Sequence, residues 1–154
     1  MAKPKLYFDT SVFGGIFDIE FQCITEKLFH MVEKGEVICL YSDLTEAELE
    51  LAPPKVRDKF FELIKKNSEY LLLSEEVIQL AQKYVDENVV GKTSIDDCRH
   101  IATATLNKAD FLVSWNFKHI VNVFRIRGYN SVNIKYGYSQ IDIRSPKEIV
   151  TSDE

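Results

Sequence analysis

Three short apolar runs, each ending at an aspartate or a serine, constrain the fold of this chain more than any other feature. They lie at residues 6–9, 36–42 and 111–114, and long stretches with apolar residues at helical spacing separate them. Their β-branched and aromatic side chains are typical of buried strands. Because strands that alternate with helices form parallel sheets, the pattern predicts an α/β fold with a mostly parallel sheet.

The same periodicities predict the remaining elements. A fourth strand is expected at residues 131–134, and residues 70–73 form a short apolar segment. Helices are expected at residues 20–34, 42–51, 54–67, 74–90, 94–108 and 119–127. The sequence shows no linker, repeat or low-complexity tract, and 154 residues suit one domain. We therefore expect a single domain over residues 1–154.

Charge and cysteine content exclude several classes of protein. With 19 basic and 24 acidic residues the net charge is −5, which excludes a uniformly basic nucleic-acid binder. Residues 111–147 carry six basic residues and one acid, so the sequence allows either a basic rim beside an acidic cleft or solvated faces that differ by chance. Three widely spaced cysteines, without a signal peptide or an apolar membrane span, predict a cytoplasmic protein with reduced thiols and no membrane contact.

Acidic residues follow the predicted strands in three separate segments. They are Asp9, Glu46, Glu48, Glu50, Asp96 and Asp97. Ser114 and Asn116 follow the run at 111–114. Because open parallel sheets form their sites at the carboxyl ends of the strands, these segments are expected to deliver carboxylates to one crevice. Such oxygen ligands suit Mg²⁺ or Mn²⁺, which can polarise a phosphodiester and activate water.

Most of these residues also have a structural explanation. Asp9 is a good N-cap for a following helix, and Asp97 in a first turn suits the helix dipole. Glutamates two residues apart point to different sides of a helix, so three of them do not all face one site. His100 and His119 are more often core-edge or surface histidines than metal ligands. Trp115 is more often a packing residue than a surface for base stacking.

Four segments of the chain resemble a known family when they are taken together. They are LYFDTSVF, YSDLTEAELE, DDCRHIATA and ADFLVSWNFKHI, which span about residues 5–120. In order and spacing they are similar to the motifs of PIN-domain ribonucleases, in particular the VapC-type toxins of type II toxin–antitoxin systems. The resemblance implies a three-layer α/β/α fold with a central, mostly parallel sheet.

The resemblance also implies roles for individual residues. Asp9, Glu48 and Asp97 match the acids that bind metal in the family, and Glu48 fits the motif better than Glu46. Supporting residues beside them are Thr10, Ser11, Asp96 and Ser114. Asn116 falls where many members carry a fourth acid, and it completes the implied catalytic set. An amide can ligate through its oxygen or orient a bound water, but it brings no charge, so a second cation should bind more weakly.

The implied function is that of a divalent-metal-dependent endoribonuclease, with Mg²⁺ or Mn²⁺ as its cofactor. The implied partners are an RNA substrate, a cognate antitoxin and a second copy of the chain in a homodimer. Basic side chains that would hold flanking phosphates are Lys92, Arg99, Lys118, His119, Arg125 and Arg127. An apolar groove around residues 50–64 is a candidate surface for a partner, although core packing explains these residues equally well.

Two kinds of protein are alternatives to this function. The first is a catalytically weak or inactive PIN-like module that binds RNA or protein; Asn116 favours it, and the three retained acids disfavour it. The second is another α/β phosphate enzyme. Ser11 stands where a haloacid-dehalogenase-like phosphatase needs its second aspartate, and neither GxxxxGK[ST] nor GxGxxG occurs. A response-regulator receiver would need an acidic pair at the first strand, which the sequence lacks.

Overall fold

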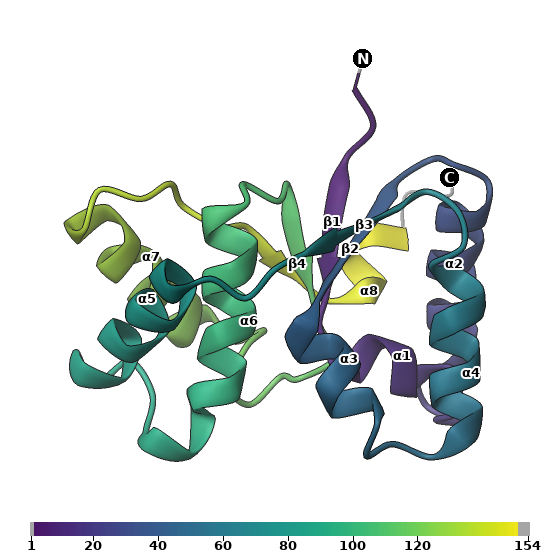
Figure 1. Cartoon of the computed structure of the whole chain (residues 1–154), viewed down its shortest axis with the longest axis horizontal. Helices are drawn as coiled ribbons and strands as arrows, with labels where there is room; N and C mark the ends of the chain where they lie inside the picture. Colours follow the sequence, from purple (N-terminus) through teal and green to yellow (C-terminus); the bar gives the residue numbers. More distant parts are fainter. Residues whose placement is uncertain (1, 151–154) are drawn as a thin grey trace.

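The apolar runs form the centre of a five-stranded parallel sheet in the computed structural model, which describes residues 2–150 (Figure 1). The strand order is β3-β2-β1-β4-β5, and each neighbouring pair is parallel. The strands are β1 (Lys5–Phe8), β2 (Ile38–Ser42), β3 (Ser68–Leu71), β4 (Phe111–Val113) and β5 (Ile143–Arg144). The predicted α/β class is confirmed, and the sheet is parallel throughout the described part. Residues 1 and 151–154 of the predicted domain lie outside the described residues.

Helices cover both faces of this sheet and complete the three layers of an α/β/α fold (Figure 1). They are α1 (Thr10–Gly15), α2 (Gln22–Glu33), α3 (Asp43–Leu49), α4 (Pro54–Leu63), α5 (Glu75–Asp86), α6 (Ile95–Leu106), α7 (Val123–Lys135) and α8 (Pro146–Val150). A short 3₁₀ turn at Lys92–Ser94 precedes α6. Within the described residues, no helix has the length and apolar character needed to cross a membrane.

Two hydrophobic cores lie on opposite faces of the sheet, because side chains alternate along each strand. Tyr7 of β1 packs in the core formed with α5, α6 and α7. Its neighbours Leu6 and Phe8 pack in the core formed with α1, α2, α4 and α8. In Figure 1, α5, α6 and α7 lie on one side of the strands, and α2 and α4 lie on the other. The strands therefore divide the interior into two separately packed halves.

The prediction of a strand at residues 131–134 is wrong, because α7 runs through this segment as one helix. Tyr129, Val132 and Asn133 are its buried residues, and their spacing of three and four is helical. Asn122 caps the helix by accepting hydrogen bonds from the backbone N–H groups of Phe124 and Arg125. The cap and the buried face outweigh the β-branched residues that suggested a strand.

The last strand lies elsewhere in the sequence. It is β5, which has only two residues and pairs with β4, so it is too short to leave an alternating pattern. The short apolar segment at 70–73 partly overlaps β3, which begins two residues earlier, at Ser68.

Gly15 ends α1 in close contact with Trp115. A Cβ atom at Gly15 would lie 2.7 Å from Trp115 Nε1 and 2.8 Å from Thr25 Oγ1. The indole is held there because Nε1 donates to Thr25 Oγ1 at 2.9 Å and the ring stacks on Phe21. Only a residue without a side chain fits between α1 and this indole.

We expect Gly15→Ala to lower the free energy of unfolding by about 1–3 kcal/mol, because the added methyl group must displace Trp115. Urea denaturation would measure the change. Gly14→Ala is the matched control, since nothing lies within 4 Å of a Cβ at Gly14, and it should be neutral or slightly stabilising. Equal stabilities of the two variants would contradict this account of Gly15.

Candidate active site

An open cavity of about 390 Å³ lies where β1, β2 and β4 end at their carboxyl edge. Its lining comes from the start of α1, from α3, from the first turns of α6 and from the segment after β4. The lining residues are Asp9, Thr10, Ser11, Glu48, Leu51, Asp96, Asp97, His100 and Asn116. The fold thus brings together the three predicted metal-binding acids and most of the residues predicted to support them. Glu46 and Glu50 do not line this cavity.

Asp9 directly follows β1 and is only 4% exposed. It takes the N-cap position of α1 but makes no capping hydrogen bond with its side chain. Instead, Oδ1 accepts a hydrogen bond from Ser11 Oγ at 2.6 Å, and Oδ2 accepts one from Ser114 Oγ at 2.7 Å. Burial raises the pKa of Asp9, against the opposing effects of His100 and the two hydroxyl groups. Both oxygens of Asp9 are therefore held in place at the floor of the cavity.

Glu48 reaches the cavity from α3. Its Oε1 accepts hydrogen bonds from Thr10 Oγ1 and from His100 Nε2, the latter at 2.7 Å. Burial by itself would raise the pKa of Glu48, but the hydrogen bonds from His100 and Thr10 bring it below its ordinary value. Glu48 is therefore an ionised carboxylate with one oxygen occupied by two donors.

Asp97 lies in the first turn of α6 and is partly buried. Burial raises its pKa, and the charges of Glu48 and Asp96 add to this effect, whereas His100 and His119 oppose it. Burial is thus the main cause of the raised pKa values of both Asp9 and Asp97.

Asn116 follows β4 and is oriented by its own turn. Its Oδ1 accepts hydrogen bonds from the backbone N–H groups of Lys118 at 3.1 Å and His119 at 3.0 Å. These two donors identify the oxygen, so the amide nitrogen faces Asp97, at 3.5 Å from Oδ2. The amide oxygen of Asn116, a candidate metal ligand by the sequence, thus accepts hydrogen bonds from the backbone of the turn. The amide nitrogen, a hydrogen-bond donor, faces the carboxylate of Asp97 instead.

The cavity is rich in oxygen ligands but open. Among residues 2–150, no three His, Cys, Asp or Glu side chains are grouped closely enough to enclose a metal ion by themselves. Carboxylate and hydroxyl oxygens nevertheless make up most of the polar lining. This arrangement suits a cation that keeps part of its water shell, as Mg²⁺ does when one or two carboxylates bind it.

The basic residues predicted to hold phosphates differ in their distance from the cavity. Arg99 lies 3.7 Å from Asp96, and His119 is close enough to Asp97 to affect its pKa. Lys92, Lys118 and Arg127 are exposed. Arg125 instead donates a hydrogen bond to the carbonyl of Val89, beside a separate cavity. None of the six lines the carboxylate cavity itself, and their role in binding RNA stays a prediction.

Sequence reasoning missed the contribution of His100 and Tyr7. His100 is 2% exposed and touches Glu48, and its Nδ1 lies 2.7 Å from Tyr7 Oη. A signal was present in the sequence, because His100 is three residues after Asp97 and therefore lies on the same face of α6. Tyr7 precedes Asp9 by two residues, which places the two on the same side of an extended chain.

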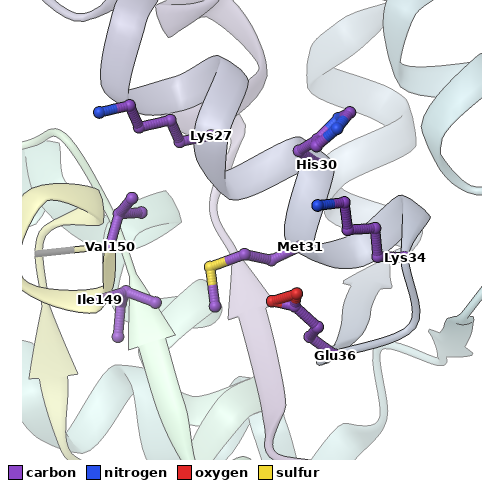
Figure 2. Close-up of a pocket in the computed structure, with 7 residues that line it drawn as sticks. All are labelled: Lys27, His30, Met31, Lys34, Glu36, Ile149 and Val150. Carbon is purple, nitrogen blue, oxygen red and sulfur yellow. The ribbon is translucent and has the colours of Figure 1, made fainter. Parts of the chain in front are cut away.

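A second cavity, of about 250 Å³, lies between α2 and α8 (Figure 2). The side chains around it are Lys27, His30, Met31, Lys34, Glu36, Ile149 and Val150. Lys34 and Glu36 precede β2, so this cavity is at the amino end of the sheet. It contains one carboxylate and none of the predicted site residues, and we therefore place the candidate active site at the opposite end.

The predicted groove at residues 50–64 is largely filled by the protein itself. Val56, Phe60 and Leu63 are buried in the core between α4 and the sheet. Only Leu51 and Phe61 among its large apolar side chains are strongly exposed, and Leu51 lies at the rim of the carboxylate cavity. Core packing thus explains most of this apolar segment.

Comparison with solved structures finds the same fold in a protein of very different sequence. A chain in the crystal structure of VapBC2 from Rickettsia felis bound to a DNA fragment from their promoter matches with a TM-score of 0.56 and 11% sequence identity. The match covers 92% of this chain and 98% of that chain. No protein-family model and no curated protein matches the sequence. At this identity the likeness shows a shared fold.

Proposed function

We propose that this chain is a divalent-metal-dependent endoribonuclease and the toxin of a toxin–antitoxin pair. The observation that carries the proposal is the cavity in which Asp9, Glu48 and Asp97 converge from three separate elements. The shared fold with a chain of the VapBC2 structure adds support by analogy. A cognate antitoxin, a homodimer and a cytoplasmic location are parts of the same proposal.

The donor set of the cavity fits Mg²⁺ or Mn²⁺. Asp9 and Asp97 have raised pKa values chiefly because they are buried, and a bound cation would favour their charged forms. Asp9, Asp97 and Glu48 would hold the ion, with the remaining positions filled by water. When bound, it would polarise the phosphodiester, lower the pKa of the attacking water and stabilise the leaving oxygen.

The residues of the chain itself have distinct tasks in this proposal. Ser11 and Ser114 hold Asp9, Thr10 helps to hold Glu48, and Asn116 donates toward Asp97. A cavity of this charge repels RNA phosphates, so substrate binding depends on the cation and on basic groups at the rim. Single-stranded RNA or an RNA loop fits best, because its backbone can bend into a narrow crevice.

Cleavage of RNA by the purified protein tests the proposal directly. Mixed single-stranded RNA would be incubated with Mg²⁺, with Mn²⁺ or with EDTA, and Asp97→Asn would serve as the inactive variant. Asp58→Asn is the matched control, since Asp58 is an exposed aspartate on α4 outside the cavity lining. Cleavage that requires the cation and is lost only in Asp97→Asn is expected. No cleavage together with no Mn²⁺ binding would favour a binding module instead.

We expect Asn116→Asp to retain full cleavage at saturating Mn²⁺ and to need about tenfold less Mn²⁺ for half-maximal activity. The aspartate keeps one acceptor for the turn and places a second carboxylate oxygen toward Asp97, where a cation would stabilise it. Titration of the cleavage rate with Mn²⁺ measures the change. Complete loss of cleavage would instead show that the amide nitrogen has a role of its own.

A further inference from the structure

A line of hydrogen bonds runs from the buried centre of the sheet to the carboxylate cavity. Tyr7 in β1 is fully buried, and its Oη lies 2.8 Å from Ser42 Oγ and 2.7 Å from His100 Nδ1. The other ring nitrogen of His100, Nε2, lies 2.7 Å from Glu48 Oε1. Four side chains from β1, β2, α6 and α3 are thus joined in one series that ends on a carboxylate of the site.

The chemistry of the two ends fixes the direction of these hydrogen bonds. The oxygens of a glutamate carboxylate only accept hydrogen bonds, so the hydrogen in the contact with Glu48 Oε1 is on Nε2 of His100. In a neutral imidazole the other nitrogen, Nδ1, is then an acceptor, and the hydroxyl group of Tyr7 donates to it. The hydrogens then point from Tyr7 to His100 and from His100 to Glu48.

The series ends on the same oxygen that Thr10 contacts. Thr10 Oγ1 and His100 Nε2 both donate to Oε1 of Glu48. In the described part of the chain, no hydrogen bond is formed by Oε2, the second oxygen. Glu48 is therefore held in one orientation, with Oε1 occupied and Oε2 available.

We propose that His100 is a positioning residue that orients Glu48 so that only Oε2 serves the cation or its bound water, and that Tyr7 selects the imidazole tautomer required for this. The inference rests on the proposed function, because it takes Glu48 as a metal-binding carboxylate. Residues that orient metal ligands in this way have a known effect, since their replacement lowers metal affinity by about 10–100-fold.

A histidine that only fills the core would behave differently. Its replacement by another residue of similar size would affect the stability of the fold, and the ability of the new side chain to donate a hydrogen bond would not matter. His100→Gln and His100→Leu separate the two roles, because both remove the ring but only glutamine can donate to Glu48. Tyr7→Phe removes one oxygen atom and leaves the imidazole in place.

The experiment measures Mn²⁺ affinity by calorimetry and the His100 tautomer by long-range ¹H–¹⁵N NMR. We expect the Nε2–H tautomer in the unaltered protein and a mixture of tautomers in Tyr7→Phe. His100→Leu should weaken Mn²⁺ binding about 10–100-fold, and His100→Gln should recover most of the loss. Thermal unfolding checks that each variant is folded, and Tyr7→Phe still tests the inference if His100→Leu does not fold.

Several outcomes would overturn the inference. They are an Nδ1–H tautomer in the unaltered protein, an unchanged tautomer in Tyr7→Phe, and equal Mn²⁺ affinities of folded His100→Leu and the unaltered protein. Affinities that are equally weak in the leucine and glutamine variants would also overturn it, because they would indicate a purely structural role. Mn²⁺ binding that depends on His100 in a protein that cleaves no RNA would refute the nuclease proposal alone, whereas no Mn²⁺ binding at all would refute both.

Discussion

Asp9→Asn is expected to reduce metal-dependent RNA cleavage by about a thousandfold or more while the protein remains folded. Asparagine has almost the same shape, and the hydroxyl groups of Ser11 and Ser114 can rotate to suit an amide as well as a carboxylate. The substitution removes only the negative charge of the Asp9 carboxylate. A loss of about 4 kcal/mol of transition-state stabilisation, of the size attributed to a bound metal, corresponds to a thousandfold lower rate.

Single-turnover cleavage of a labelled RNA at saturating Mn²⁺ measures this effect. Asp58→Asn carries the same change of charge on the exposed surface of α4 and should cleave like the unaltered protein. Circular dichroism and thermal unfolding confirm that both variants are folded. If Asp9→Asn retained cleavage, Asp9 would not be required for the reaction, and Glu48 and Asp97 would remain as the candidate metal ligands.

Asp97→Asn is expected to make the metal-free protein more stable at neutral pH and to abolish its stabilisation by Mn²⁺. Because the pKa of Asp97 is raised in the folded state, the folded protein holds this proton more tightly than the unfolded chain does. Stability from this group is therefore present at low pH and is lost as the pH rises from about 4, the ordinary pKa of aspartate, through the raised value. Asparagine does not ionise, so this loss disappears.

Urea denaturation in EDTA between pH 4 and 8 measures the first part of this prediction, and the curve of Asp97→Asn should fall less steeply with pH. The second part follows from linkage: Mn²⁺ at about 100 times its Kd should stabilise the unaltered protein by about 2.7 kcal/mol. Asp97→Asn should gain almost nothing at the same concentration. An equal gain in both proteins would mean that the cation binds somewhere other than the carboxylate cavity.

The sequence predicted the strands that carry the site because each one is a short, continuous run of buried residues. The order of the strands also explains why Asp9 and Asn116 lie near each other, since Asp9 directly follows β1 and Asn116 lies just beyond β4, its neighbour in the sheet. The prediction of a strand at residues 131–134 was wrong because the segment is not a continuous run of buried residues. In that segment the composition favoured a strand, while the buried face of α7 repeats with helical spacing.

The hydrogen bonds to Glu48 were beyond what a single sequence reveals. His100 lies among buried alanine and isoleucine residues of α6, so its pattern in the sequence is that of a core position. Its partner Glu48 is 52 residues away, and only the packing of α3 beside α6 brings the two together. Side-chain contacts of this kind depend on how two helices are placed, which local periodicity does not specify.

Because the sheet divides the interior into two cores, the carboxylate cavity depends on the packing of both of them. Leu49, next to Glu48, packs in one core, and Ile101, next to His100, packs in the other. The hydrogen bond between Glu48 and His100 therefore crosses the boundary between two independently packed layers. Local unfolding can expose amide hydrogens to exchange in one layer while the other layer stays folded. Such unfolding of either layer would separate Glu48 from His100 and disrupt the cavity. Only the completely folded chain presents the assembled site.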